Sequence, residues 1–277
     1  MDAKLQRRVQ RYGWDLASQD YDPLWQEQLT PARTWMLSLA ALAPGEKVLD
    51  LACGTGLVTL AAAASVGPGG SVLGTDLSGQ MIEVARERAR AQRATNVQFE
   101  RMDAETLDFP DATFDVVLCS LGLMYLPDPQ RAVREWRRVL KPGGRVAIGV
   151  WGKRANCGWS PVFPIVEAEV DSDVCPLFFS LGEPDALAQL CEDAGFRSVR
   201  QRRIATILSY ADAETACDAA FVGGPVALAW SRFDPEVRTH VRARYRHAIE
   251  PWRRNEGYRL PGEFVVAAGI APASSGD

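Results

Sequence analysis

The chain lacks long apolar runs and is poor in the residues that build metal sites. It has two histidines among 277 residues. Its six cysteines stand at positions 53, 119, 157, 175, 191 and 217. No two cysteines form a Cys-x-x-Cys pair, so no zinc site is predicted. No stretch of about 18 apolar residues occurs, so we expect no membrane-spanning helix. The polar beginning, Met1-Asp2-Ala3-Lys4, lacks the apolar core of a signal peptide. Scattered thiols in such a chain indicate a reduced, cytoplasmic protein.

An excess of basic residues is also missing. The formal charge is -4, from 31 Lys+Arg against 35 Asp+Glu, whereas a dedicated nucleic-acid-binding domain is normally basic. We therefore expect no nucleic-acid partner. His240 and His247 stand seven residues apart among arginines, which indicates a solvated basic face rather than a catalytic pair. No Ser/His/Asp order and no metal-ligand spacing is found, so the sequence assigns neither a catalytic residue nor a metal site.

Short apolar runs alternate with helix-favouring segments from residue 47 onward. Hydrophobic residues make up 47% and charged residues 24% of the chain, which are ordinary globular values. We expect strands at 47–51, 71–75, 97–101, 114–120, 145–151, 200–210 and 263–270. Strands that alternate with helices predict a parallel sheet with helices on both faces. The predicted fold is therefore α/β: a doubly wound, mostly parallel, seven-stranded Rossmann-like sheet with N-terminal helices and a helical cap insertion.

The strongest local signal is the glycine turn that follows the first predicted strand. Val48 to Leu51 leads into Ala52-Cys53-Gly54-Thr55-Gly56, and a helix-favouring segment follows. Glycines let a ligand approach the backbone closely, and the N–H groups of the next helix can receive an anion. Asp50 stands at the end of this strand, and Asp76 follows Gly54 by 22 residues at the end of the next strand. This pattern fits a cofactor that contains adenosine.

An NAD-binding Gly-x-Gly-x-x-Gly fingerprint is a competing interpretation of the same turn. When the fingerprint is laid on Gly54 and Gly56, its third glycine falls on Thr59. Because that glycine allows close packing of helix on strand, its loss weakens the NAD interpretation.

Five ordered motifs resemble those of class I S-adenosylmethionine (SAM) dependent methyltransferases, in particular the subgroup of ubiquinone/menaquinone-biosynthesis methyltransferases. Together they span about residues 47–151. They are the segments 48–56, 74–81, 102–110, 114–128 and 140–144. On this resemblance, residues 1–45 form an N-terminal helical cap, and residues 46–277 form the SAM-binding domain with helical inserts at about 152–180 and 211–258.

The resemblance also implies roles for single residues. Gly54 and Gly56 would approach the methionine part of SAM, with Asp50 orienting the loop or meeting the amino group. Asp76 would hold the ribose, Leu77 and Met81 would flank the adenine, and Asp103 would take its exocyclic amine. Ser120 would face the methyl group, and an aromatic side chain from the N-terminal helices, Tyr21, would cover SAM. The same motifs add Ala52, where the family's first glycine is replaced by alanine, and Thr55, Ala104 and Glu105.

The three added segments are rich in aromatic residues, and we expect them to build the acceptor pocket. They hold Trp14, Tyr21, Trp25, Trp159, Phe163, Phe178, Phe179, Phe221, Trp230 and Tyr258. Such a supply suits a small apolar, aromatic or acidic molecule. The predicted function is methyl transfer from SAM to an O, N, C or S atom of such a molecule. An NAD-dependent oxidoreductase and a non-catalytic SAM-binding module are the alternatives, and the sequence predicts no oligomeric state.

Overall fold

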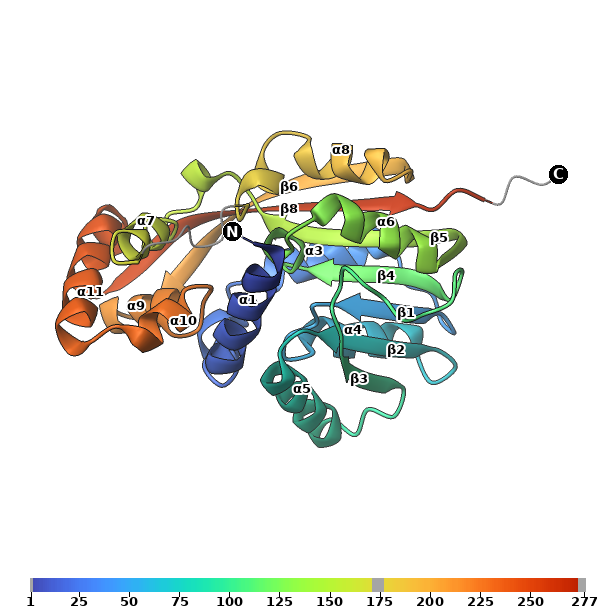
Figure 1. Ribbon diagram of the computed structural model, residues 1–277, viewed down its shortest axis with the longest axis horizontal. Helices are drawn as coiled ribbons and strands as arrows, with labels where there is room; N and C mark the ends of the chain where they lie inside the picture. Colours follow the sequence, from blue (N-terminus) through green and yellow to red (C-terminus); the bar gives the residue numbers. More distant parts are fainter. Residues whose placement is uncertain (1, 171–176, 274–277) are drawn as a thin grey trace.

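A single mixed sheet forms the centre of the protein in a computed structural model that describes residues 2–170 and 177–273 (Figure 1). The strand order is β3-β2-β1-β4-β5-β8-β6, and a short β7 pairs with β8. The strands are β1 (Lys47–Leu51), β2 (Ser71–Asp76), β3 (Val97–Arg101), β4 (Phe114–Ser120), β5 (Leu140–Trp151), β6 (Arg197–Tyr210), β7 (Arg253–Arg254) and β8 (Gly257–Ile270). The seven predicted strands are therefore present, and β7 adds two residues.

The first five strands are parallel, and β8 runs antiparallel to both β5 and β6. Four of the five residues of β1 are buried, and β4 is buried along most of its length. Strands buried on both faces are typical of a parallel sheet with helices on each side. Figure 1 shows α6 (Pro129–Val139) and α8 (Ala186–Asp193) in front of the sheet and α3 (Thr30–Ala40) and α4 (Leu57–Val66) behind it. The doubly wound α/β fold is confirmed.

The antiparallel strands are longer than predicted. β8 begins at Gly257, six residues before the predicted start at Glu263, and pairs with β6 as far as Tyr210↔Tyr258. Pro261 and Gly262 lie inside this extension, and both residues normally argue against a strand. The sequence pattern therefore placed the strand start too late. β5 also begins early, at Leu140, because Leu140 pairs with Phe114 before the register shifts.

Helices from three distant parts of the chain gather beyond the carboxyl ends of the parallel strands (Figure 1). The N-terminal part contributes α1 (Ala3–Ala17) and α2 (Tyr21–Trp25), and the segment after β5 contributes α7 (Val162–Glu167). The connection between β6 and β8 contributes α9 (Ala213–Phe221), α10 (Ala227–Arg232) and α11 (Pro235–Ile249). Helix α1 packs on α10 and on α5 (Gly79–Ala91), whereas α2 packs on α9. The N-terminal helices thus connect the sheet to the inserted helices.

None of the helices in the described ranges combines the length and the apolar character that crossing a bilayer requires.

Two helices begin with residue types that favour helix starts. Ser78 caps α5, and its hydroxyl accepts a hydrogen bond from Met81 N. Asp128 caps α6, and its carboxylate accepts a hydrogen bond from Arg131 N. Cys175 lies outside the described residues.

Candidate functional site

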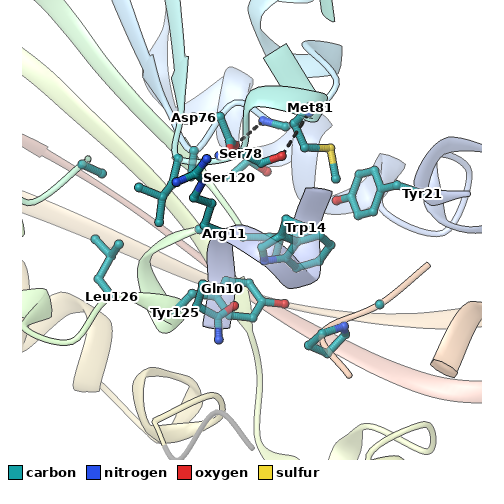
Figure 2. Close-up of a pocket in the computed structure, with 18 of the residues that line it drawn as sticks. Gln10, Arg11, Trp14, Tyr21, Asp76, Ser78, Met81, Ser120, Tyr125 and Leu126 are labelled. Carbon is teal, nitrogen blue, oxygen red and sulfur yellow. Dashed lines mark hydrogen bonds between the residues drawn. The ribbon is translucent and has the colours of Figure 1, made fainter. Parts of the chain in front are cut away.

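A cavity opens at the carboxyl ends of β1, β2 and β4, where open α/β sheets bind their ligands. The α1 helix and the segment before α10 close its other side. Figure 2 shows Asp76, Ser78 and Met81 on one side of the space and Gln10, Tyr125 and Leu126 on the opposite side. Nine of the predicted cofactor residues line this cavity: Tyr21, Ala52, Gly54, Asp76, Leu77, Met81, Asp103, Ala104 and Ser120.

The Asp76 carboxylate ties together the loops that follow β1 and β2. Its Oδ2 accepts a hydrogen bond from Gly54 N at 2.8 Å, and its Oδ1 accepts one from Ser78 N, also at 2.8 Å. Ser78 Oγ accepts in turn from Met81 N at 3.1 Å (Figure 2). Gly54 has a positive φ of 54°, a conformation that costs an ordinary residue energy. A short loop is therefore held open around one half-buried carboxylate.

A second, smaller hollow continues the cavity toward the start of α4. It shares Tyr21, Ala52, Gly54 and Ser120 with the main cavity. Asp50, Thr55 and Arg33 add polar groups to its wall, and Leu57 and Val58 bring the first turn of α4 to it. A helix N-terminus attracts carboxylates. The hollow thus combines an acidic group, a guanidinium and a helix start in one place.

Gly56 and Glu105 are the two predicted residues that line neither space. Gly56 has a φ of 80°, and a Cβ on it would come within 3.1 Å of Ala85 and of the Phe99 ring. Glu105 is buried, accepts a hydrogen bond from Asp128 N at 3.0 Å and pairs with Arg7 at 2.6 Å. Both residues therefore have a packing role in this structure.

Burial raises the pKa of the two acidic groups at the strand ends. Desolvation raises the pKa of Asp50 to about 7 and that of Asp76 to about 6. Thr59 Oγ1 donates to Asp50 Oδ2 at 2.6 Å, whereas Asp50 Oδ1 has no hydrogen-bond partner in the described ranges. Burial also lowers the pKa of Arg33. A cationic ligand would favour the ionised form of both carboxyls, because an opposite charge nearby lowers the pKa of an acid.

Polar contacts hold the two N-terminal helices against the loops after the first three strands. Asp15 Oδ1 of α1 accepts from Ser78 Oγ at 2.6 Å, and Arg7 Nε lies 2.9 Å from Asp103 Oδ2. On α2, Asp22 accepts from Thr55 Oγ1 at 2.6 Å and pairs with Arg88. Each contact joins residues at least 33 positions apart, so sequence spacing could not reveal it.

Another part of the cavity wall is aromatic. Trp14, Trp25 and Trp159 from the predicted aromatic set line it, and Trp151 and Tyr125 were not singled out from the sequence. The Trp14 and Tyr125 rings meet edge to face, 5.3 Å between centroids. Phe163, Phe178 and Phe179 pack around Trp159, whereas Phe221 and Trp230 stack on each other. Tyr258 is buried, and its hydroxyl lies 3.3 Å from Glu250. Six of the ten predicted aromatic residues do not line the cavity, against the expectation that they build the acceptor pocket: Phe163, Phe178, Phe179, Phe221, Trp230 and Tyr258.

Most of the other titratable groups that the sequence pointed to lie away from this chemistry, and the exception is Cys53, which lines the second hollow. His240 is 60% exposed at its side chain and lies 4.0 Å from Glu169. Five cysteines are free and buried, namely Cys53, Cys119, Cys157, Cys191 and Cys217. Burial raises the pKa of Cys157 to about 12. Within residues 2–170 and 177–273, no group of three or more His, Cys, Asp and Glu could hold a metal ion.

Comparison with known proteins decides between the two candidate cofactors. Residues 48–144 match the family described as methyltransferase domain. A ubiquinone/menaquinone biosynthesis C-methyltransferase UbiE from Pasteurella multocida is 42% identical over 185 residues, which cover 60% of this chain and 69% of that protein. The chain belongs to the class I SAM-dependent methyltransferases. SAM is the cofactor of this family, and the comparisons do not favour the NAD alternative.

Other relatives extend this result. Aklanonic acid methyltransferase DauC from a Streptomyces species is 36% identical over 147 residues, which cover 53% of this chain and 66% of that protein. A solved structure of a methyltransferase from Bacillus halodurans has a TM-score of 0.61 at 21% identity and covers 87% of this chain and 99% of the other. That likeness shows the shared fold. The chain spans 47 to 66% of the length of several curated relatives that it matches.

The buried carboxyls predict a pH dependence of stability. In the unfolded chain an aspartate titrates near pH 3.9, whereas Asp50 titrates at about 7 in the folded protein. As the pH rises from about 4 to 7, the unfolded state ionises first, so the free energy of unfolding falls, by at most about 1.4 kcal/mol per pH unit for each such carboxyl. Asp50→Asn, which cannot ionise, should make this fall shallower in urea unfolding at pH 5 and pH 7.

Asp185→Asn is the matched control, because Asp185 is exposed and its side chain makes no capping hydrogen bond. It should leave the slope between pH 5 and pH 7 unchanged. If the free energy of unfolding of Asp50→Asn fell between pH 5 and pH 7 as much as that of the native protein, ionisation of Asp50 would not be the cause of the fall.

Proposed function

We propose that this protein transfers a methyl group from SAM to a small organic acceptor inside the cavity. The observation that carries the proposal is one continuous space that joins the nine cofactor residues to an aromatic end. The names of the relatives support a small acceptor, since they refer to ubiquinone, menaquinone and aklanonic acid. A cytoplasmic location and the absence of a nucleic-acid partner stay predictions.

The residues present fit SAM at the strand ends. Asp76 offers carboxylate oxygens to the ribose hydroxyls, and Leu77 and Met81 supply apolar contact for the adenine. We assign the exocyclic amine to Asp103, whose carboxylate also pairs with Arg7 and accepts from Glu105 N. Gly54 has nothing within 4 Å of the Cβ position, so its backbone leaves room for the methionine part. When bound, SAM supplies a methyl group on a sulfonium that is already a good leaving group.

We assign the amino-acid end of SAM to the second hollow. Asp50 there has a carboxylate oxygen without a partner in the described residues, which suits an ammonium group. Arg33 and the first turn of α4 suit the carboxylate, because guanidinium and helix N-termini both bind carboxylates. Arg33 was not predicted from the sequence, since it lies outside the motifs and reaches the site only through the folding of α3 against the sheet.

The protein contributes mainly alignment and exclusion of water. Among the described residues that line the main cavity there is no histidine and no glutamate, and its two aspartates lie at the cofactor end. Methyl transfer from a sulfonium draws much of its rate from proximity and orientation. An acceptor atom that is acidic enough to lose its proton before attack therefore suits this site. The α1 and α2 helices cover the reacting groups, which keeps water out.

Transfer is tested with methyl-labelled SAM and a panel of phenols, hydroxynaphthalenes and 1,3-diketones. The label should move to at least one acceptor, and Asp76→Ala should lower kcat/KM for SAM about 100-fold, because two charge-assisted hydrogen bonds are lost. Asp115→Ala is the control. Asp115 lies at the amino end of β4, whereas the cavity lies at the carboxyl ends of the strands, and it pairs with Lys141, so Asp115→Ala should leave KM for SAM unchanged.

If SAM binds but no acceptor takes the label, the non-catalytic binding module becomes the better account. If Asp76→Ala and Asp115→Ala behave alike, the ribose assignment is wrong.

The position of the amino-acid end is tested with Arg33→Met. This change keeps a long apolar side chain and removes the charge. It should weaken S-adenosylhomocysteine about tenfold in calorimetry, the cost of one charge-assisted hydrogen bond. Binding of 5′-methylthioadenosine, which lacks the amino-acid group, should be unchanged. Equal weakening of both ligands would contradict a contact between Arg33 and the carboxylate.

A further inference from the structure

The aromatic end of the cavity contains one buried donor that the protein does not satisfy. Trp159 is 1% exposed and lines the cavity. Its ring is surrounded by the rings of Trp151 at 4.9 Å and of Trp25, Phe163 and Phe178 at 5.5 Å between centroids. The indole Nε1 of Trp159 has no hydrogen-bond partner in the part of the chain that the structure describes.

Two other buried tryptophans have partners for their N–H groups. Trp25 Nε1 donates to Ala219 O at 3.1 Å, and Trp136 Nε1 donates to Ala104 O at 2.8 Å. Buried indole N–H groups normally have a partner, and an unmade hydrogen bond carries a desolvation cost. Trp159 lines the cavity while its Nε1 is itself buried, so a ligand that moves one of the surrounding rings aside can satisfy this donor.

The chemistry of the donor limits what that ligand can be. An indole N–H donates and cannot accept, so it recognises an oxygen with a free lone pair rather than an amine or a hydrocarbon. The neighbouring walls are aromatic, with Trp14, Tyr125 and Trp151 beside the same space. Flat apolar walls favour a flat ring system. The two aspartates of the cavity lie at the cofactor end, where Asp103 already faces Arg7.

We propose that Trp159 Nε1 is a specificity-determining donor that binds a carbonyl, phenolate or ether oxygen on a planar ring acceptor. The inference rests on the proposed function, because it names the acceptor class of that site. It selects, among the apolar, aromatic and acidic acceptors that suit the cavity, those that carry a ring oxygen remote from the cofactor. Trp159 positions and discriminates the acceptor and takes no part in the transfer itself.

A competing role for the same N–H is a contact with the face of a neighbouring ring. Such N–H···π contacts are weak but real, and the four surrounding rings could accept one. In that case Trp159 only packs in the core, and a ligand with a ring oxygen would bind no more tightly than the same ligand without it. The two roles predict different responses to a pair of ligands that differ in one oxygen.

The test uses 1-tetralone and tetralin, which share a ring system and differ in the carbonyl. Both are titrated into the protein saturated with S-adenosylhomocysteine. The native protein should bind 1-tetralone about tenfold more tightly than tetralin, the worth of one satisfied buried donor. Trp159→Phe keeps the ring and removes the N–H, so it should abolish this preference. In a ¹H–¹⁵N spectrum, the indole signal that is absent from Trp159→Phe should move downfield with 1-tetralone only.

Trp136→Phe is the matched control, because Trp136 does not line the cavity and its N–H is already bonded to Ala104 O. It should lower stability and keep the preference for 1-tetralone. Equal affinities in the native protein, an unchanged preference in Trp159→Phe, or no binding of either ring would overturn the proposal. Saturation with S-adenosylhomocysteine is measured first, so a failure of the proposed cofactor site appears there and is not confused with a failure at Trp159.

Discussion

The hydrogen bonds from Gly54 N and Ser78 N to the Asp76 carboxylate are the constraint on which the site depends. They join the loops after two neighbouring parallel strands through one half-buried acid. The positive φ of Gly54 and the cap of α5 at Ser78 belong to the same arrangement. Partial burial makes the charge of this acid costly until a ligand contributes hydrogen bonds or positive charge. The loop is therefore preorganised for a cationic nucleoside.

The cap of N-terminal helices depends on the same loops. Asp15 reaches Ser78, Asp22 reaches Thr55, and Arg7 reaches Asp103. On the cavity side, these contacts are formed by residues in the proposed cofactor motifs. The same contacts therefore hold the N-terminal helices over the cavity and fix the loops that shape it. The arrangement places Trp14 and Tyr21 over the cavity (Figure 2), where they separate the strand ends from solvent.

Much of the sheet and of the cofactor site could be predicted from the sequence. The strands β1, β4, β5 and β8 contain buried apolar runs, and the glycine turn with Asp50 and Asp76 has a spacing set by one strand–helix–strand unit. The local sequence is sufficient to predict these features, because each is formed by residues that are close together in the sequence. The start of β8 was misplaced because Pro261 and Gly262 disguise a strand that only its pairing with β6 stabilises.

What could not be predicted depends on contacts between distant segments. Arg33 reaches the site from α3, and nothing in its local sequence marks it. Tyr125 lies inside the motif segment 114–128, but the motif does not show that its ring faces the cavity. Thr55 lies in the motif but donates to Asp22, and Gly56 serves packing against Phe99. A motif identifies residues that lie near a ligand. Which of them face the ligand is decided by the elements that pack around the motif.

The central claim is that the strand-end cavity binds SAM, and calorimetric titration of the native protein with S-adenosylhomocysteine tests it most directly, with NAD as the control. The account predicts one site per chain with a micromolar Kd for S-adenosylhomocysteine, an affinity of about 8 kcal/mol, and no heat with NAD. Absence of binding by S-adenosylhomocysteine, or tighter binding of NAD, would contradict it, because the assignments to Asp76, Asp103 and Arg33 all depend on that ligand.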